Sequence, residues 1–274
     1  MAMTVTDHRL NFSYGTTRLT YRRLGSGPTV LLAFHGMGQD ATLFLPFAQT
    51  GFTLYSIDLF YHGNSRPAAP DTLGKLPVLT KSDWQSLLAA FLHEHRIERF
   101  SVAGFSLGGR FALMTADLFT DRLDELLLLA PDGITPNVWF RLATRRALGR
   151  RLFRFLLDHV PLFHRAGQAL SRLGLVNKYA LRFAETMLET PAQREQLYQT
   201  WTLLRRFSVD IPKLAAKLNE QNVRVRVFFG RFDRIVPLAT ARPLLRRLHS
   251  YELIVLKAGH NRLVERAADL LSRT

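Results

Sequence analysis

The motif Gly104-x-Ser106-x-Gly108 has the residue types and spacing to present a serine as a nucleophile. It ends a short apolar run that begins at Phe100, and a helix-compatible stretch follows at once. This order is typical of a nucleophile elbow, a sharp strand-to-helix turn that exposes the serine. The turn strains the backbone at the serine, and side chains at 104 and 108 would clash with neighbouring chain. The motif favours attack by Ser106 on an electrophilic carbon over a glycine-rich turn with an incidental serine.

A serine hydroxyl needs a base to take its proton, and the base needs an acid to orient it. Asp233 and His260 each come just after an apolar run, and they follow Ser106 in the chain order found with the nucleophile elbow. We expect Asp233 to hold the imidazole of His260, which would deprotonate Ser106 and then protonate the leaving group. Asp132 is the alternative acid, although a simple turn aspartate explains it better.

Two backbone N–H groups would stabilise the oxyanion that forms when Ser106 attacks, each by roughly 3 kcal/mol in the transition state. One is predicted to be the N–H of Leu107, directly after the serine. The other is predicted to be the N–H of Met37, because the loop of residues 35–38 follows an apolar run and contains two glycines. Phe105, beside the serine, is a candidate wall of the substrate pocket.

The elements that must position these residues can be read from the hydrophobic pattern. Near-continuous apolar runs predict strands buried on both faces, as in a parallel sheet covered by helices. Helical patterns at 84–95, 107–119, 238–248 and 263–271 alternate with the runs, which favours an α/β fold with a mostly parallel, open sheet. The first thirty residues alternate with period two and predict an antiparallel hairpin. The apolar runs are residues 30–34, 53–57, 101–103, 126–129, 223–229 and 253–256.

The alternation of strands and helices stops between residues 134 and 207, where only amphipathic helical patterns occur. We predict a core of residues 1–133 and 208–274 and a helical lid of residues 134–207. Such an insertion would lie over the carboxyl ends of the strands, where open α/β sheets place their sites. Most of its large aromatic side chains are expected to pack the lid onto the body, and a few to line an apolar pocket. They are Trp139, Phe140, Phe153, Phe155, Phe163, Phe183 and Trp201.

Composition excludes several classes of protein. The 274 residues contain no cysteine, which rules out disulfides and cysteine-ligated metal, and we expect no metal and no cofactor. No stretch approaches the roughly 20 apolar residues of a membrane span. Residues 1–10 lack the apolar core of a secretory peptide, so we expect a cytoplasmic protein.

The net charge of +15 is concentrated in the predicted lid, where thirteen Lys or Arg stand against four Asp or Glu. Because the arginines are interleaved with apolar residues at helical spacing, a solvated arginine-rich surface is the favoured interpretation. Weak contact with an anionic membrane surface, or attraction of an acidic substrate, is the alternative. No nucleic-acid-binding module is recognisable, so we expect no nucleic-acid partner.

Together these motifs resemble those of the α/β-hydrolase superfamily, in its group of lidded esterases, C–C hydrolases and related enzymes. The resemblance implies a triad of Ser106, Asp233 and His260. In residues 58–65, Phe60 and Tyr61 replace the Pro-Gly pair that the family often has, so this loop should differ in shape. The motifs that carry the resemblance are His35-Gly36-x-Gly38, residues 58–65, Gly104-x-Ser106-x-Gly108-Gly109, Gly230-x-x-Asp233 and Gly259-His260.

The leading functional prediction is a serine hydrolase of carboxylic esters whose small-molecule substrate carries an apolar acyl group. A second is a C–C hydrolase or a pyruvate-eliminating lyase similar to the menaquinone-pathway enzyme, with Arg110 binding a substrate carboxylate. An ion pair or a solvated helix position is the simpler role for Arg110. A third is a non-catalytic ligand-binding or membrane-peripheral protein on a hydrolase scaffold. His35, Phe105 and Arg110 are the candidate substrate contacts, and the oligomeric state stays open.

Overall fold

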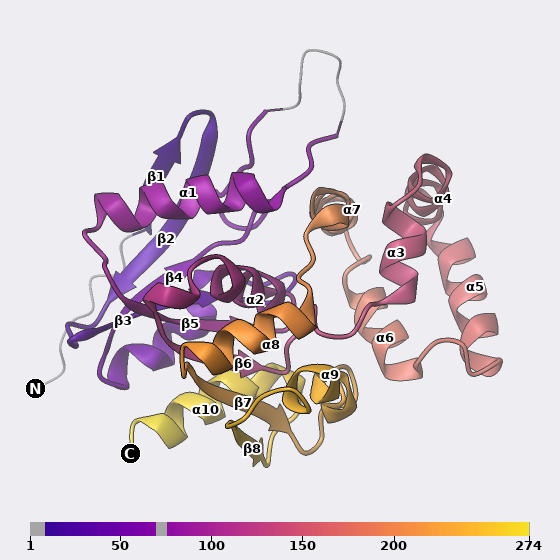
Figure 1. The fold of residues 1–274 in the computed structure, drawn as a ribbon. Helices are drawn as coiled ribbons and strands as arrows, with labels where there is room; N and C mark the ends of the chain where they lie inside the picture. Colours follow the sequence, from indigo (N-terminus) through magenta and orange to yellow (C-terminus); the bar gives the residue numbers. More distant parts are fainter. Residues whose placement is uncertain (1–8, 70–75, 274) are drawn as a thin grey trace, which may run out of the picture.

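The computed structural model describes residues 9–69 and 76–273, which form one eight-stranded sheet with helices on both faces (Figure 1). The strand order is β1-β2-β4-β3-β5-β6-β7-β8. The strands are β1 (Arg9–Tyr14), β2 (Thr17–Leu24), β3 (Thr29–Phe34), β4 (Phe52–Ile57), β5 (Phe100–Phe105), β6 (Leu123–Leu129), β7 (Arg224–Gly230) and β8 (Glu252–Leu256).

The sheet is mostly parallel. β2 pairs antiparallel with both β1 and β4, and the remaining neighbours are parallel. Helices on both faces bury the central strands completely, which explains why every residue of β5 is buried and apolar or small. The predicted α/β fold, with an N-terminal hairpin and a mostly parallel sheet, is confirmed.

One strand departs from expectation. The run at 253–256 was expected to be buried on both faces, but β8 lies at the edge of the sheet, where Leu253 is 39% and Val255 is 52% exposed. The expectation is wrong because an apolar run records only the side chains of a strand. It does not record whether a further strand or helix covers them.

Helices pack on the two faces of the sheet in separate groups. On one face α2 (Gly108–Leu118) contacts both α1 (Lys81–Glu94) and α8 (Ile211–Glu220), while α9 (Arg242–Leu245) packs beside α8. On the other face α10 (Leu263–Leu271) contacts the 3-10 segment η1 (Ala41–Gln49). Trp84 of α1 joins the first two of these helices, because its Nε1 donates to Oγ1 of Thr115 on α2 at 3.0 Å.

Five helices are inserted between β6 and α8, and they lie beside the sheet at the right of Figure 1. We call these five helices the lid; the boundaries 134–207 stay a prediction. Within the lid, α3 packs on α4, α4 on α5 and α7, and α5 on α6. The helices are α3 (Val138–Thr144), α4 (Ala147–Asp158), α5 (Val160–Arg172), α6 (Lys178–Thr186) and α7 (Pro191–Leu203).

The described residues contain neither a candidate membrane span nor a candidate metal site. None of their helices is both long and apolar enough to cross a membrane. No group of three or more His, Asp or Glu side chains within residues 9–69 and 76–273 is arranged to hold a metal ion. The prediction about a secretory peptide concerns residues 1–10, and residues 1–8 lie outside the described part of the chain.

Candidate active site

Ser106 lies on the sharp turn between β5 and α2. Its φ of 51° is in the left-handed region, which costs a non-glycine residue free energy and persists only where the surroundings enforce it. Three hydrogen bonds do so. The N–H of Ser106 donates to Leu129 O at 3.0 Å, and its carbonyl accepts from the N–H of Gly109 at 2.9 Å and of Asp132 at 2.8 Å.

The glycines around the serine are required by close backbone approach. A Cβ at Gly104 would lie 2.5 Å from the carbonyl oxygen of Gly108. A Cβ at Gly108 would lie 2.0 Å from the carbonyl oxygen of Phe34, on the neighbouring strand β3. Both distances are far below van der Waals contact, so the packing of α2 against the sheet depends on the absence of side chains here.

Asp233 and His260 meet although 27 residues separate them. Nδ1–H of His260 donates to Oδ2 of Asp233 at 2.6 Å, and the two side chains are 4% and 0% exposed. The other carboxylate oxygen of Asp233 accepts from the N–H groups of Ile235 at 2.9 Å and Val236 at 3.0 Å. Since Nδ1 carries the proton, Nε2 of His260 is left with a free lone pair. This Nε2 is buried without a hydrogen-bond partner.

Ser106 and His260 lie at the same edge of the sheet, because each follows the carboxyl end of a parallel strand. The ring of Phe105, next to the serine, lies 4.7 Å from the ring of His260, centroid to centroid. No hydrogen bond among the described residues joins Ser106 to His260. Such contacts are often long in ligand-free sites and tighten when substrate binds.

The lid covers this histidine. Phe183 of α6 approaches His260 edge to face, with ring centroids 6.0 Å apart. Just after α6, Met187 lies over the loop that carries Met37, because a Cβ at Gly38 would be 2.8 Å from its Sδ. His260 is therefore held between an aromatic ring of the body and one of the lid, in surroundings that exclude water.

The N–H groups of the loop after β3 are largely occupied. That of Gly36 donates to Oε1 of Gln39 at 3.0 Å, and that of Gly38 donates to Nε2 of His62 at 3.1 Å. Among the described residues no acceptor is recorded for the N–H of Met37, nor for that of Leu107 after the serine. These are the two groups predicted as oxyanion donors, and both stay available to a ligand.

His35 lies beneath this loop and is fully buried. Its Nδ1–H donates to Gly36 O at 2.7 Å, and its Nε2 accepts from the N–H of Leu59 at 2.9 Å. Burial lowers the pKa of His35 to about 4, so the ring is neutral at neutral pH. Because both nitrogens of His35 are engaged, the ring is placed to hold the loop after β3 against the loop after β4. The sequence had suggested that His35 contacts the substrate.

His62 is a second buried imidazole at the site, and the sequence pattern assigned it no role. Its ring centroid is 5.1 Å from that of His35, and burial lowers its pKa to about 3. Because its Nε2 accepts from Gly38, it fixes the backbone one residue beyond Met37. It lies in the loop of residues 58–65, where Phe60 is buried and Tyr61 has a φ of 65°. The family motif in this loop is the signal that could have identified it.

Asp58, at the start of the same loop, has one satisfied and one unsatisfied oxygen. Oδ1 accepts from the N–H of Ala41 at 2.7 Å, and Oδ2 is buried with no hydrogen-bond partner. Burial raises the pKa of this carboxyl above its usual value. Gly63 passes so close that a Cβ there would lie 2.0 Å from Oδ2.

Arg110 and Asp132 pair with each other. Nε of Arg110 donates to Oδ2 of Asp132 at 2.7 Å, and the guanidinium carbon lies 4.2 Å from the ring centre of Phe140 on α3. The imidazole of His260 is thus paired with Asp233, and Asp132 has a cationic partner of its own. Arg110, only 7% exposed, connects the helix after the serine to the first helix of the lid.

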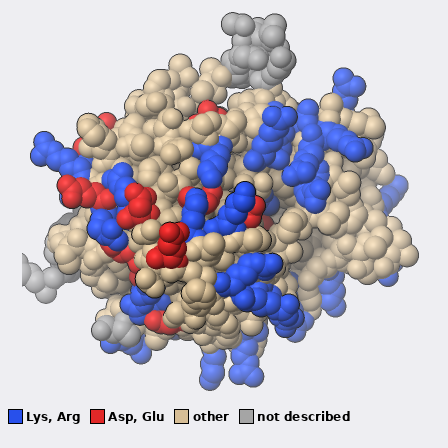
Figure 2. All heavy atoms as spheres, in the orientation of Figure 1, with Lys and Arg blue, Asp and Glu red and all other residues tan. Residues whose placement is uncertain are grey.

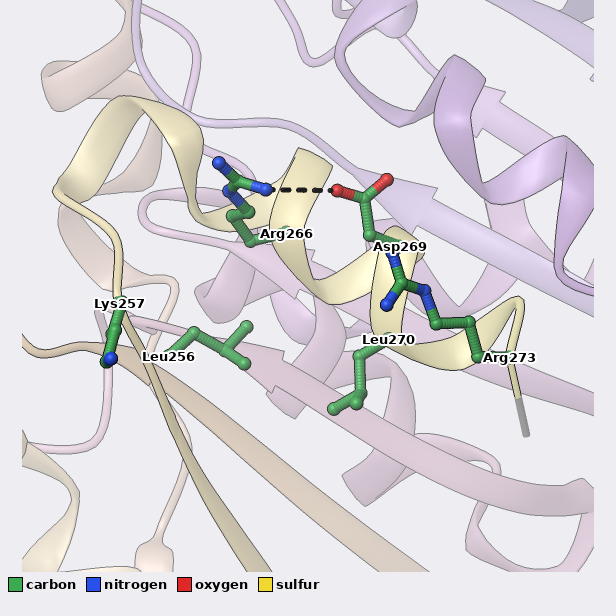
Figure 3. Close-up of a pocket in the computed structure, with 6 residues that line it drawn as sticks. All are labelled: Leu256, Lys257, Arg266, Asp269, Leu270 and Arg273. Carbon is green, nitrogen blue, oxygen red and sulfur yellow. Dashed lines mark ion pairs between the residues drawn. The ribbon is translucent and has the colours of Figure 1, made fainter.

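Two cavities of about 370 Å³ each lie elsewhere on the surface. One is between β8 and α10, where Arg266 and Asp269 form an ion pair (Figure 3). The other is beside Gly38 and Gly63. None of the predicted site residues lines either cavity.

Relatives found by sequence match either part or most of this chain. An uncharacterised protein of Mycobacterium bovis is 35% identical over 133 residues, which are 46% of this chain. That stretch is 36% of the relative, so the match spans about a third of the relative's length. A 2-hydroxy-6-oxononadienedioate/2-hydroxy-6-oxononatrienedioate hydrolase of Paraburkholderia phymatum is 26% identical over 257 residues, 89% of this chain and 84% of that protein.

A thermophilic esterase from Thermogutta terrifontis has the same fold. It superposes with a TM-score of 0.66 at 19% identity, covering 97% of this chain and 96% of that chain. The family model described as alpha/beta hydrolase fold matches residues 29–267. The sheet order, the strained serine after β5 and this match lead to one conclusion: the chain belongs to the alpha/beta hydrolase fold family.

Proposed function

We propose that the chain is a serine hydrolase that cleaves carboxylic esters with an apolar acyl group, using Ser106, His260 and Asp233. The observation that carries the proposal is the pair of Asp233 and His260, which leaves Nε2 of the histidine buried without a partner at the sheet edge where Ser106 lies. Burying a hydrogen-bond acceptor without a partner costs free energy. Nε2 gains a partner when it accepts the hydroxyl proton of the nucleophile.

In the first half of the reaction Ser106 Oγ attacks the ester carbonyl while Nε2 of His260 takes the hydroxyl proton. The carbonyl oxygen becomes an oxyanion and accepts from the N–H groups of Met37 and Leu107. Collapse of this intermediate breaks the bond to the alcohol, which leaves with the proton from His260. Ser106 then holds the acyl group as an ester.

Water completes the cycle. His260 takes a proton from water, the hydroxide attacks the acyl carbon, and the proton returns to Ser106 Oγ as the carboxylic acid leaves. Asp233 stays ionised throughout and stabilises the imidazolium that forms in each half. The apolar surroundings, with Phe105 and Phe183 against His260, suit a substrate whose acyl group is apolar.

The test is hydrolysis of p-nitrophenyl esters with two to sixteen acyl carbons. The unchanged chain should turn them over, and Ser106→Ala should lose activity by a factor on the order of 10³ or more while remaining folded. Ser272→Ala, at an exposed serine after α10, is the matched control and should keep full activity. A fluorophosphonate probe should label the chain once, at Ser106. Equal activity in Ser106→Ala would overturn the proposal.

The second candidate is cleavage of a C–C bond in an anionic substrate by the same residues. It is favoured by the long match to a hydrolase that is named for a dienedioate substrate. If Arg110 binds a substrate carboxylate, Arg110→Met should raise KM for a 2-hydroxy-6-oxo diacid and leave KM for a neutral ester unchanged. If Arg110 serves only to pair with Asp132 and contact Phe140, Arg110→Met should instead change KM modestly and equally for both substrates.

A further inference from the structure

The lid exposes apolar side chains that a water-soluble surface would normally bury. On α4, Leu148 is 77%, Leu152 is 57% and Phe155 is 46% exposed. Their spacing of four and three residues places them on one face of the helix. Phe153 and Leu157 are buried on the opposite face, so the inward side of α4 is already packed. The exposed face is a second apolar stripe, on which Phe155 stacks against His159 and the two leucines stay largely in solvent.

The neighbouring helices continue this pattern. Val138 and Leu142 on α3 are 61% and 60% exposed, and Leu173 and Leu175 after α5 are 72% and 59% exposed. Trp139 Nε1 donates to Leu175 O at 3.2 Å, which joins the start of α3 to the turn after α5. Large exposed apolar side chains gathered on neighbouring helices are typical of interaction surfaces. We call the set the lid face: Val138, Trp139, Leu142, Leu148, Leu152, Phe155, Leu162, Leu173 and Leu175.

Cations are interleaved with these side chains. Arg151 lies on α4 between Leu148 and Leu152, and Arg165 lies one turn from Leu162 on α5. On α4, Arg154 pairs with Asp158 and Glu195. Six other arginines of α3, α4, α5 and their connections are exposed and form no ion pair with a described acidic side chain. In Figure 2 the part of the visible surface over the lid shows blue and tan atoms with almost no red. These arginines are Arg141, Arg145, Arg146, Arg151, Arg165 and Arg172.

We propose that the lid face docks on the surface of an anionic phospholipid bilayer. Leucine and phenylalanine side chains would enter the boundary between headgroups and acyl chains, and the arginines beside them would pair with lipid phosphates. Charge complementarity selects this occupant. A second copy of the chain would bring a face with the same positive charge, and a nucleic acid would leave the leucines exposed to water.

The docking surface and the hydrolytic residues are separate features of the chain. His260 is covered by α6, whereas the lid face belongs to α3, α4, α5 and the turn after α5. Membrane binding can therefore be measured in the Ser106→Ala variant, which cannot consume its target. A failure of the hydrolase proposal would leave the binding result intact, and the reverse also holds.

The experiment is vesicle flotation of the full chain carrying Ser106→Ala. Vesicles of phosphatidylcholine alone are compared with vesicles that also contain about 30 mol% phosphatidylglycerol. We expect at least about tenfold stronger binding to the anionic vesicles, and a loss of binding when the salt concentration is raised, because exposed charges are screened. Equal binding to both vesicles, or no binding by the folded chain, would overturn the proposal.

Two pairs of variants separate the apolar and the ionic contributions. Leu148→Ser with Leu152→Ser should weaken binding about tenfold or more, while Leu253→Ser with Val255→Ser on the exposed edge strand β8 should not change it. Arg145→Gln with Arg151→Gln should weaken binding. Arg242→Gln with Arg246→Gln, which removes the same charge from α9 and the residue that follows it, should have a smaller effect.

Sedimentation velocity without lipid tests the competing occupant. A monomer in both the Ser106→Ala chain and the leucine variant is the expected result. A dimer that dissociates in Leu148→Ser with Leu152→Ser would show that the lid face joins two copies of the chain, and it would overturn docking on lipid. Circular dichroism at the same concentrations verifies that each variant is folded.

Discussion

The central strands bury their apolar side chains, whereas the lid exposes many of its own. Every residue of β5 is buried, and so is every leucine of β6, whereas α4 buries one side and exposes leucines and a phenylalanine on the other. Packing within the chain is sufficient to explain the residues of the strands. It does not explain those of the lid, whose outward face has the composition of a surface that meets something outside the chain.

The two regions also differ in whether their charged side chains form ion pairs. In the sheet Arg226 and Glu125 form a largely buried, two-pronged ion pair between neighbouring strands. Most arginines on the outer helices of the lid have no described acidic partner, and Arg154, which pairs with Asp158 and Glu195, is the exception on α4. The sheet pairs these two charges inside the body, whereas the outer helices of the lid present most of their arginines to solvent.

The largest effect should come from the same substitution made in each region. Leu128→Ala, in fully buried β6, should lower the free energy of unfolding by about 2–5 kcal/mol, because it removes burial and leaves a cavity. Leu148→Ala, at a 77% exposed position of α4, should change it by less than about 0.5 kcal/mol. Urea titration of both variants measures the difference. Equal losses would mean that the lid leucine is buried in solution, and the contrast would fail.

Acid should weaken the body through its buried imidazoles. The pKa of His62 is about 3 in the folded chain against 6.5 when unfolded, so below pH 6.5 the unfolded state binds a proton that the folded state does not. This contribution to stability is complete above pH 6.5 and is lost as pH falls toward 3. For His62 alone, the loss in the free energy of unfolding between pH 7 and pH 5 is about 2 kcal/mol.

The lowered pKa of His35 also reduces the free energy of unfolding as pH falls, and the raised pKa of Asp58 opposes this loss. Free energies of unfolding at pH 7, 6 and 5 should therefore show a shallower slope in His62→Asn than in the unchanged chain. A slope that is identical in the two chains would contradict this account of the body.

The smallest effect is expected where the two regions meet. Arg110→Met removes the ion pair with Asp132 and the contact with Phe140, and should cost about 1 kcal/mol, because Asp132 keeps 30% of its side chain in water. Limited proteolysis should then cleave the lid faster than in the unchanged chain, while the body resists as before. Arg99→Met, at an exposed pair with Asp124, is the control and should have no such effect.

Much of the body could be predicted from sequence because local rules agree with its packing. The periodic run at 263–271 has the same bounds as α10, and the spacing of Gly104 and Gly108 reflects a backbone contact that excludes a Cβ. The segment 238–248 was predicted as one helix and forms a 3-10 turn, η4 (Leu238–Ala241), followed by the short α9. Pro243 suits a helix start and cannot donate within one, which explains the break.

Other features depend on contacts that no local pattern contains. The bond from Gly38 to His62 joins loops 24 residues apart, so the sequence pointed to the glycine loop but gave the histidine no part in it. Helical periodicity in the lid predicted helices but not the direction of each face. Phe140 and Phe153 are buried, but Phe155, one of seven aromatics of which most were expected to pack the lid and a few to line a pocket, is 46% exposed. The adjacency of Asp233 and His260 was inferred from their order along the chain and from their positions after apolar runs, and their roles stay a proposal.

The path of the chain between β6 and β7 has an evolutionary consequence. These strands are parallel neighbours, with Leu129 opposite Phe228, and a parallel pair needs a crossover. Since α8 supplies that crossover against α2, the five helices before it are a detour that the sheet does not require. Recombination can exchange such a detour for another without altering strand order or the turns that carry Ser106 and His260. Where the protein binds and what it hydrolyses can then diverge independently in descendants of one ancestral body.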